Sequence, residues 1–306
     1  MKSSAASMVD ATMTSENFQS DAPSIGRIIW REIYKDKIAF TALVIFCAII
    51  ITTFVWSGLM DEAAMTRVHL PSRNQPPGEQ FMWGTDDRGA DMVGMLVFGA
   101  RNTILVGFSV TIIASTFGIL LGLISGFFAG HTDNIIMRIV DTVLMLPTLM
   151  IIIVFVTLRR DYSPVDFVLI MSLFSWMGTC RLIRAMSLQQ RNLDYVSASK
   201  TLGTRNIMIM FREVLPNLIP IISVNLTLGL AGNMGLETSL TFLGFGLPFG
   251  TPSLGYLIGL ARQPSVMQFR MWQWLPAALL VFVLMLCIYC VGQAVRRASD
   301  VRTRRD

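Results

Sequence analysis

The sequence predicts an all-α, polytopic membrane protein with six transmembrane helices, and three observations support this fold class. Hydrophobic residues make up 53% of the 306 residues and charged residues only 15%, whereas a soluble domain carries about 25% charged residues. Charge-free apolar blocks of the length that crosses a bilayer alternate with short charged segments. The first 26 residues are polar and lack the apolar core of a signal peptide.

Six apolar blocks follow one another along the chain. The fifth block contains Pro216 and Pro220, so we expect an interrupted helix there. The predicted spans cover approximately residues 38–59, 102–130, 134–158, 167–185, 214–236 and 271–295.

The distribution of basic residues predicts the orientation in the membrane. The N-terminal tail, the segment 181–212 and the C-terminal tail carry 5, 6 and 5 Lys plus Arg residues, against 4, 2 and 2 in the segments on the opposite side. By the positive-inside rule, both termini are cytoplasmic. We therefore expect four parts: a polar cytoplasmic tail (1–26), the first transmembrane helix with an external loop (27–101), a five-helix core (102–296) with a cytoplasmic loop at 187–216, and a basic cytoplasmic tail (297–306).

The cytoplasmic loop has the pattern of two short helices that meet at a glycine. Val196, Ala198 and Leu202 are apolar among polar neighbours. Gly203 suits the left-handed residue that ends a helix, and Thr204 suits the start of the next one. Such a loop would project towards a partner protein, although an amphipathic helix that merely joins two spans has the same pattern.

This loop resembles the E-A-A-x-x-x-G-(x9)-I-x-L-P signature of bacterial ABC-importer permeases. The matching residues are Ser197, Ala198, Ser199, Gly203, Leu215 and Pro216. Ser197 replaces the Glu, Ser199 replaces an Ala and Glu213 replaces the Ile, while Asp194 lies about one turn before Ser197. The resemblance implies that these residues and Asp194 form a coupling helix, which docks in a cleft on an ATPase subunit.

Two further segments resemble motifs of oligopeptide and dipeptide permeases. The first is similar to G-T-D-x-x-G-R-D, with Ala90 in place of the Arg, and comprises Gly84, Thr85, Asp86, Gly89 and Asp91. The second begins at Glu237 and is similar to E-T-x-L-S-F-L-G-F-G, with Thr241 in place of the Ser. The three motifs occur in order over residues 27–296, and the set resembles the shorter, C-type permease of the pair.

The resemblance implies the ABC type I importer permease fold and a set of partners. These are a second homologous permease, two ABC ATPase subunits, an extracytoplasmic peptide-binding protein and a peptide substrate, in a bacterial cytoplasmic membrane. The chain itself would bind no cofactor and would not be an enzyme. Lys200 is the sole lysine after Lys37 and no glycine precedes it, so a P-loop is absent, and ATP and Mg would bind the partner ATPases. A related permease for nickel or another small solute is the alternative.

Other polar residues leave alternatives open. Asp86, Asp87 and Asp91 lack the spacing of a calcium-binding EF-hand loop, so a turn leading into a helix is favoured. Arg138 and Asp141 share a helix face and predict an ion pair within one helix, or else a gating contact. Glu237 would line the pathway or cap a helix on the external side.

Four other classes of function are disfavoured. Basic residues flank apolar blocks rather than form an aromatic-interleaved patch, so we expect no nucleic-acid partner. Cys287 and Cys290 lie in an apolar block, and the chain has two histidines, so we expect no metal site. An intramembrane hydrolase built on Ser125 would need a histidine in an apolar span, and a stand-alone channel or secondary carrier is disfavoured because no internal repeat is evident.

Overall fold

The computed structural model describes residues 25–159 and 161–303, so the predicted tail 1–26 lies almost entirely outside the described residues. Within them the chain forms helices and no strand; two residues make one isolated β-bridge. The five long apolar helices are α3 (Lys37–Leu59), α5 (Met92–Phe128), α8 (Pro164–Arg191), α11 (Leu215–Leu243) and α14 (Leu275–Thr303).

Short elements complete the described chain. The helix α2 (Ile25–Lys35) precedes α3, and α6 (Gly130–Leu144) and α7 (Thr148–Leu158) connect α5 to α8. Between α8 and α11 come α9 (Asp194–Thr201), α10 (Asn206–Ile209) and η3 (Met210–Val214), and α10 and η3 continue directly into α11. The remaining elements are α4 (Glu62–Met65), η2 (Leu70–Ser72), α12 (Leu254–Gly259), η4 (Leu260–Arg262), α13 (Pro264–Phe269) and η5 (Met271–Gln273).

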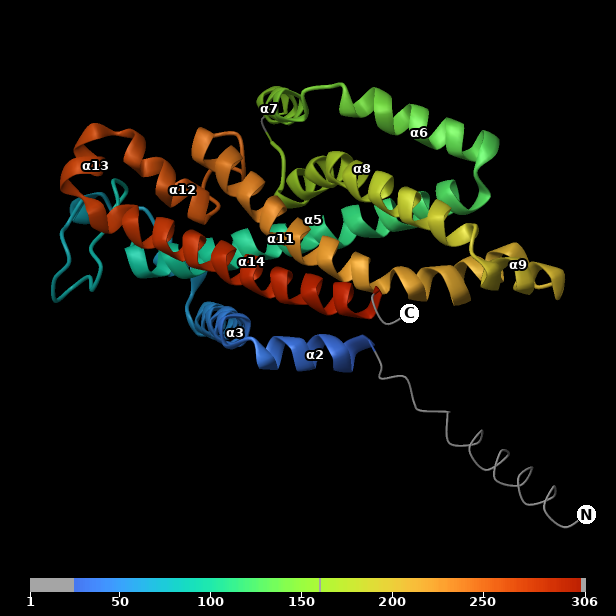
Figure 1. Ribbon diagram of the computed structural model, residues 1–306. Coiled ribbons are helices and arrows are strands. Elements are labelled where there is room, and N and C mark those ends of the chain that lie inside the picture. The colour runs from blue at the N-terminus through green and yellow to red at the C-terminus, as the bar shows by residue number, and fades with distance from the viewer. Residues whose placement is uncertain (1–24, 160, 304–306) are drawn as a thin grey trace, which may run out of the picture.

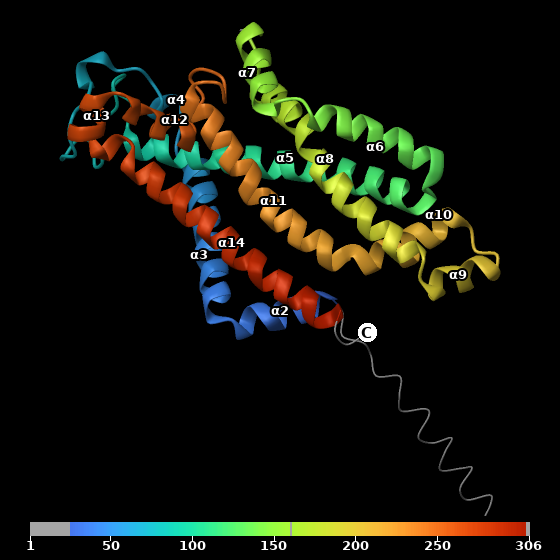
Figure 2. The same cartoon turned by 45° about the horizontal axis from the view of Figure 1, so that its top comes forward.

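The long helices form one bundle with two different ends. The helix α5 packs against both α8 and α11, and α14 packs against α11 and α3. Both views place α9 at one end of this bundle, and α12 and α13 at the other (Figure 1 and Figure 2). We call these the α9 end and the α12 end.

A stripe of glycines brings α5 close to α8. A methyl group added at Gly118, Gly122 or Gly126 would lie 2.7, 2.5 and 2.4 Å, respectively, from a backbone carbonyl oxygen of α8. Helices within membranes approach closely where small residues repeat every four positions, because van der Waals packing replaces the hydrophobic effect. The contact between α5 and α8 is therefore a backbone-to-backbone one over this length.

The third predicted span is a bent pair of helices rather than one helix. The axes of α6 and α7 differ by 72° across the break that separates them. Pro147 is the N-cap of α7, and a proline disfavours helical geometry in the residue before it. The described residues therefore contain five candidate membrane spans, or six when the bent pair counts as one span.

Three details of the helices differ from or add to the predicted segments. The helix α5 begins at Met92, so the predicted division between 27–101 and 102–296 falls inside it. The helix α14 continues into the predicted tail 297–306 as far as Thr303. Pro216 and Pro220 do not interrupt the fifth span, because a π-helical turn at Met210–Val214 leads into Pro216 near the start of α11 and the helix continues through Pro220.

Candidate functional site

The loop at the α9 end terminates a helix at the residue that the sequence predicts. Gly203 has a φ of +80°. Its N–H donates to the carbonyl of Lys200 at 3.0 Å, and the N–H of Thr204 donates to the carbonyl of Ser199 at 3.1 Å. This pair of hydrogen bonds is the Schellman motif. Thr204 does not cap the next helix, however, because α10 starts after Arg205, which makes no side-chain capping bond.

The base of this loop is packed against the bundle. Val196 of α9 is fully buried, in a cluster that includes Leu123 of α5, Ile183 of α8 and Leu218 of α11. The ammonium group of Lys200 lies 5.5 Å from the ring centroid of Phe127 at the end of α5. The loop therefore contacts the three central helices and is not a free connector.

The tip of the same loop exposes apolar side chains. Leu202 is 85% exposed and Ile207 is 62% exposed, and Met208 and Phe211 are also exposed. Exposed apolar side chains on a projecting loop are available for contact with a partner. Both views show α9 projecting from the end of the bundle (Figure 1 and Figure 2).

Two residues that depart from the permease signature are partners of each other. The hydroxyl of Ser199 lies 2.9 and 2.8 Å from the two carboxylate oxygens of Glu213. This contact joins α9 to the π-helical turn η3 that leads into α11. The pairing explains why a serine and a glutamate stand together where the signature has an alanine and an isoleucine.

The other predicted coupling residues divide between the surface and the helix start. Asp194, Ser197 and Ala198 are exposed on α9. Leu215 and Pro216 are half-buried in the first turn of α11, and Leu215 packs against the cluster around Val196. The exposed α9 residues are thus available for contact with a partner, whereas Leu215 and Pro216 belong to the start of a membrane span.

At the α12 end, the segment similar to G-T-D-x-x-G-R-D forms a compact turn. Gly84 and Gly89 have φ values of +71° and +81°, which favour glycine. The Oδ1 atom of Asp86 accepts the backbone N–H groups of Arg88 and Ala90 at 2.9 and 2.8 Å. Burial raises the pKa of the Asp86 carboxyl above its usual range. The segment is thus a hydrogen-bonded turn.

The turn is attached to elements on both sides of it. Asp91 caps α5 by accepting the N–H of Val93 at 2.9 Å. The hydroxyl of Thr85 donates to the carbonyl of Ser72. The amide nitrogen of Gln273 in η5 donates to the carbonyl of Thr85 at 2.8 Å, so the turn is also fixed to the segment before α14.

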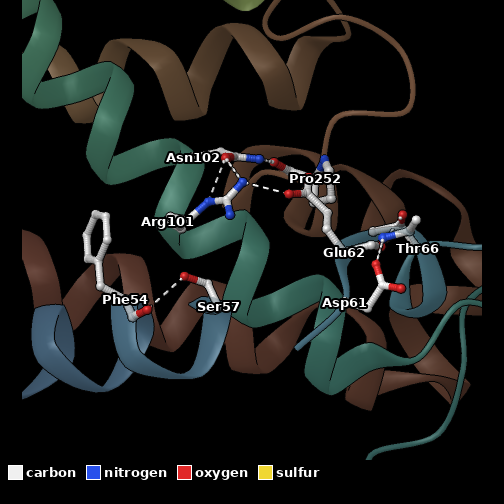
Figure 3. A network of polar contacts seen from close by, with 9 residues as sticks. Phe54, Ser57, Asp61, Glu62, Thr66, Arg101, Asn102 and Pro252 are labelled. Carbon is white, nitrogen blue, oxygen red and sulfur yellow. Dashed lines mark hydrogen bonds and ion pairs between the residues drawn. The ribbon is translucent and has the colours of Figure 1, made fainter. Parts of the chain in front are cut away.

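Polar contacts also tie α5 to neighbouring segments at this end (Figure 3). Arg101 donates to Glu62 of α4 at 2.7 Å. The amide of Asn102 donates to the carbonyl of Pro252 at 2.9 Å, just before α12. The connecting segments are therefore held on the end of the bundle.

Glu237 lies inside α11, and the external-cap interpretation is wrong. The helix continues to Leu243, and Glu237 is fully buried. Its carboxyl group accepts the hydroxyl of Thr241 at 2.9 Å and is also hydrogen-bonded by Thr103 of α5 and Ser253. Buried carboxyl groups require such partners, so Glu237 holds α11, α5 and the start of α12 together.

Arg138 and Asp141 do not form the predicted ion pair within one helix. Asp141 pairs instead with Arg181 of α8, and Arg138 is exposed. About two turns earlier on the same helix, a second ion pair joins α6 to α8, and the sequence did not predict it. Its acid, Asp133, lies 51 residues before its partner Arg184, so no local pattern in the sequence links the two.

That second pair lies near the turn between α5 and α6. Arg184 donates to both carboxylate oxygens of Asp133, at 2.5 and 2.6 Å. The hydroxyl of Ser125 donates to the same carboxylate at 2.5 Å. Ser125 is therefore part of a structural network that joins α5, α6 and α8.

The fold and these sites define a polytopic, all-α membrane protein with a projecting loop at one end. Residues 118–303 match the family model described as "Binding-protein-dependent transport system inner membrane component", and the chain belongs to this family. It has the ABC type I permease fold, as its sequence motifs predict.

Several curated relatives cover nearly the whole chain. "Oligopeptide transport system permease protein OppC" of Lactococcus lactis is 41% identical over 288 residues, which is 94% of this chain and 98% of the relative. "Oligopeptide transport system permease protein AmiD" of Streptococcus pneumoniae is 31% identical over 95% of this chain and 94% of its own. "Dipeptide transport system permease protein DppC" of Bacillus subtilis is 28% identical over 90% of this chain and 85% of its own. These relatives are transport permeases, not enzymes.

Proposed function

We propose that the chain is one of two membrane-spanning permease subunits of an ATP-driven peptide importer in a bacterial cytoplasmic membrane. A second homologous permease would complete the pathway, and two ATPase subunits would bind at the α9 end. A peptide-binding protein would deliver substrate at the α12 end. The observation that carries the proposal is the loop at the α9 end, whose apolar tip is exposed while its base is packed into the bundle.

The orientation follows from the basic residues. The α9 end carries Arg191, Lys200, Arg205 and Arg212, so we place it in the cytoplasm together with both termini. The α12 end is then external. The substrate class rests on the names of the relatives, which specify oligopeptides or dipeptides and favour these over nickel.

The mechanism would transmit ATPase closure through α9. Mg and ATP bind to the partner subunits, because this sequence contains no P-loop. Movement of α9 would reach α5 and α8 through Val196, and would reach α11 through the hydrogen bond from Ser199 to Glu213. The inward- and outward-open states would be favoured by their different contacts with nucleotide and binding protein.

The test is Leu202→Asp in the assembled transporter. A charge at the loop tip should reduce the amount of ATPase subunit that copurifies by at least about tenfold, because desolvating a carboxylate in an apolar cleft costs several kcal/mol. Met82→Asp is the matched control, since Met82 is 76% exposed at the opposite end. Equal ATPase recovery in the two variants would refute the assignment of the α9 end.

A stand-alone channel or carrier is the remaining rival. The purified chain in liposomes, without partners, should neither hydrolyse ATP nor take up peptide. Uptake by the chain alone would favour the rival.

A further inference from the structure

A cavity of about 980 Å³ opens at the α12 end. Its wall is formed by the G-T-D turn (residues 84–91), the end of α7, the end of α11 together with the segment that follows it, and α12. Ligand-binding pockets in proteins typically measure about 300–1,000 Å³ and are lined by apolar and aromatic side chains with a few polar groups. The aromatic residues of this wall are Tyr162, Phe245, Phe249 and Tyr256.

One cation in the wall is held by aromatic rings. The guanidinium carbon of Arg88 lies 4.2 Å from the ring centroid of Phe249 and 5.5 Å from that of Tyr256. Among the residues that the structure describes, no hydrogen bond or ion pair engages this guanidinium group. A guanidinium group that lies against ring faces keeps its in-plane N–H donors available.

Two other polar groups of the wall, Tyr162 and Arg262, are already engaged. The hydroxyl of Tyr162 donates to the carbonyl of Gly246 at 2.6 Å. Arg262 donates to the carbonyls of Gly259 and Leu243 at 3.1 and 3.3 Å. Arg88 is thus a hydrogen-bond donor whose position in the cavity is fixed by the aromatic rings. Its guanidinium group forms no ion pair with an acidic side chain of the described residues.

The neighbouring acids Asp86 and Asp87 do not pair with the guanidinium group of Arg88. Asp86 is fully buried, and its Oδ1 atom serves the backbone of its own turn. Asp87 forms no ion pair with Arg88. Both acids weaken the positive field around Arg88, but the guanidinium donors themselves stay available to a ligand.

We infer that this cavity receives a peptide by its carboxyl terminus. The planar guanidinium group of Arg88 would form two parallel N–H···O bonds with the carboxylate, and the aromatic wall would hold the adjacent side chain. The inference rests on the proposed peptide substrate and on the external placement of the α12 end. It adds a site on the permease itself, at which released peptide would pause before it enters the pathway.

The experiment uses the assembled transporter in nanodiscs and two probes. One is a tripeptide with a neutral dansyl group on its N-terminus and a free carboxylate, and the other is the same peptide with a C-terminal amide. Fluorescence anisotropy should show the acid binding at least about tenfold more tightly than the amide, since hydrogen bonds between charged groups are the stronger class. Arg88→Gln should reduce the affinity of the acid to that of the amide, and Arg88→Lys should retain part of it.

The matched control is Arg67→Gln. Arg67 is exposed in the segment before the G-T-D turn and does not line the cavity, so its loss removes the same charge without removing the proposed donors. Equal binding of acid and amide to the wild type, an equal loss in Arg67→Gln, or acid binding that survives Arg88→Gln would overturn the carboxylate site. Acid-selective binding without ATP-dependent uptake would support the site and contradict the proposed importer function.

Discussion

At the α9 end, a short loop packed on one side presents apolar side chains on the other, whereas at the α12 end several connecting segments fold over the bundle and surround a cavity. Val196 and Leu202, six residues apart, are fully buried and 85% exposed, respectively. At the α12 end, Thr85, Asp86, Glu237 and Gln273 are all buried and hydrogen-bonded. The two ends therefore differ: one exposes apolar side chains on a projecting loop, and the other keeps a fixed shape around a cavity through buried hydrogen bonds.

The comparison requires the two ends to lie on opposite sides of the membrane. The test of this placement by cysteine labelling has the largest expected effect. In a cysteine-free variant, single cysteines at Glu79 and Asn206, both exposed, should react with an impermeant thiol reagent from opposite faces. Each cysteine should be labelled from one face and not at all from the other, because the bilayer separates the two compartments. Reaction of both from one face would place both ends on the same side.

The second prediction compares the same backbone strain at each end. Gly203 and Gly250 have φ values of +80° and +91°, and a methyl group added to either would meet no atom within 4 Å. Replacing either by valine therefore costs about 1–2 kcal/mol of backbone strain, and the added Cβ itself meets no neighbouring atom. Gly203→Val should reduce ATPase copurification and peptide uptake several-fold while membrane insertion stays normal.

Gly250→Val is the control for strain alone, and its ATPase recovery should match the wild type. Quantitative blotting of each subunit after purification measures both variants. Similar ATPase losses in the two would mean that the α9 loop has no special role in partner binding.

The third prediction has the smallest expected effect and concerns the contact between Ser199 and Glu213. Ser199→Ala and Glu213→Ala should each lower peptide uptake per ATP hydrolysed by about two- to threefold, equivalent to about 0.5 kcal/mol for a half-exposed hydrogen bond. The double variant should be no worse than either single one, because both remove the same contact. Additive losses would show that the two residues act separately.

Local features of this fold could be predicted from the sequence because they depend on few neighbours. Apolar length identified α3 and α14, and the left-handed glycine at Gly203 follows from its place after a short helix. Contacts between distant residues could not be predicted in this way. Asp141 pairs with Arg181, 40 residues away, and the nearer Arg138 was the natural expectation.

Two other differences have the same physical origin. Glu237 was placed at the end of its span because a carboxyl group in an apolar helix is costly, and its hydroxyl partners from α5 and the segment before α12 became visible only in the folded chain. The aromatic contacts of Arg88 likewise come from residues more than 150 positions later in the sequence. Composition alone does not bring such residues together.

The glycine stripe between α5 and α8 affects how far a tilt at the α9 end displaces the α12 end. Helices in backbone contact cannot slide past one another without collision, so we expect α5 and α8 to move together as one rigid unit. With 37 residues, α5 is about 55 Å long at 1.5 Å per residue. A rotation of about 5° around the α9 end would then displace the other end by about 5 Å, roughly the pitch of one helical turn. A small tilt imposed on α9 would thereby become a displacement large enough to reshape the opening beside Arg88.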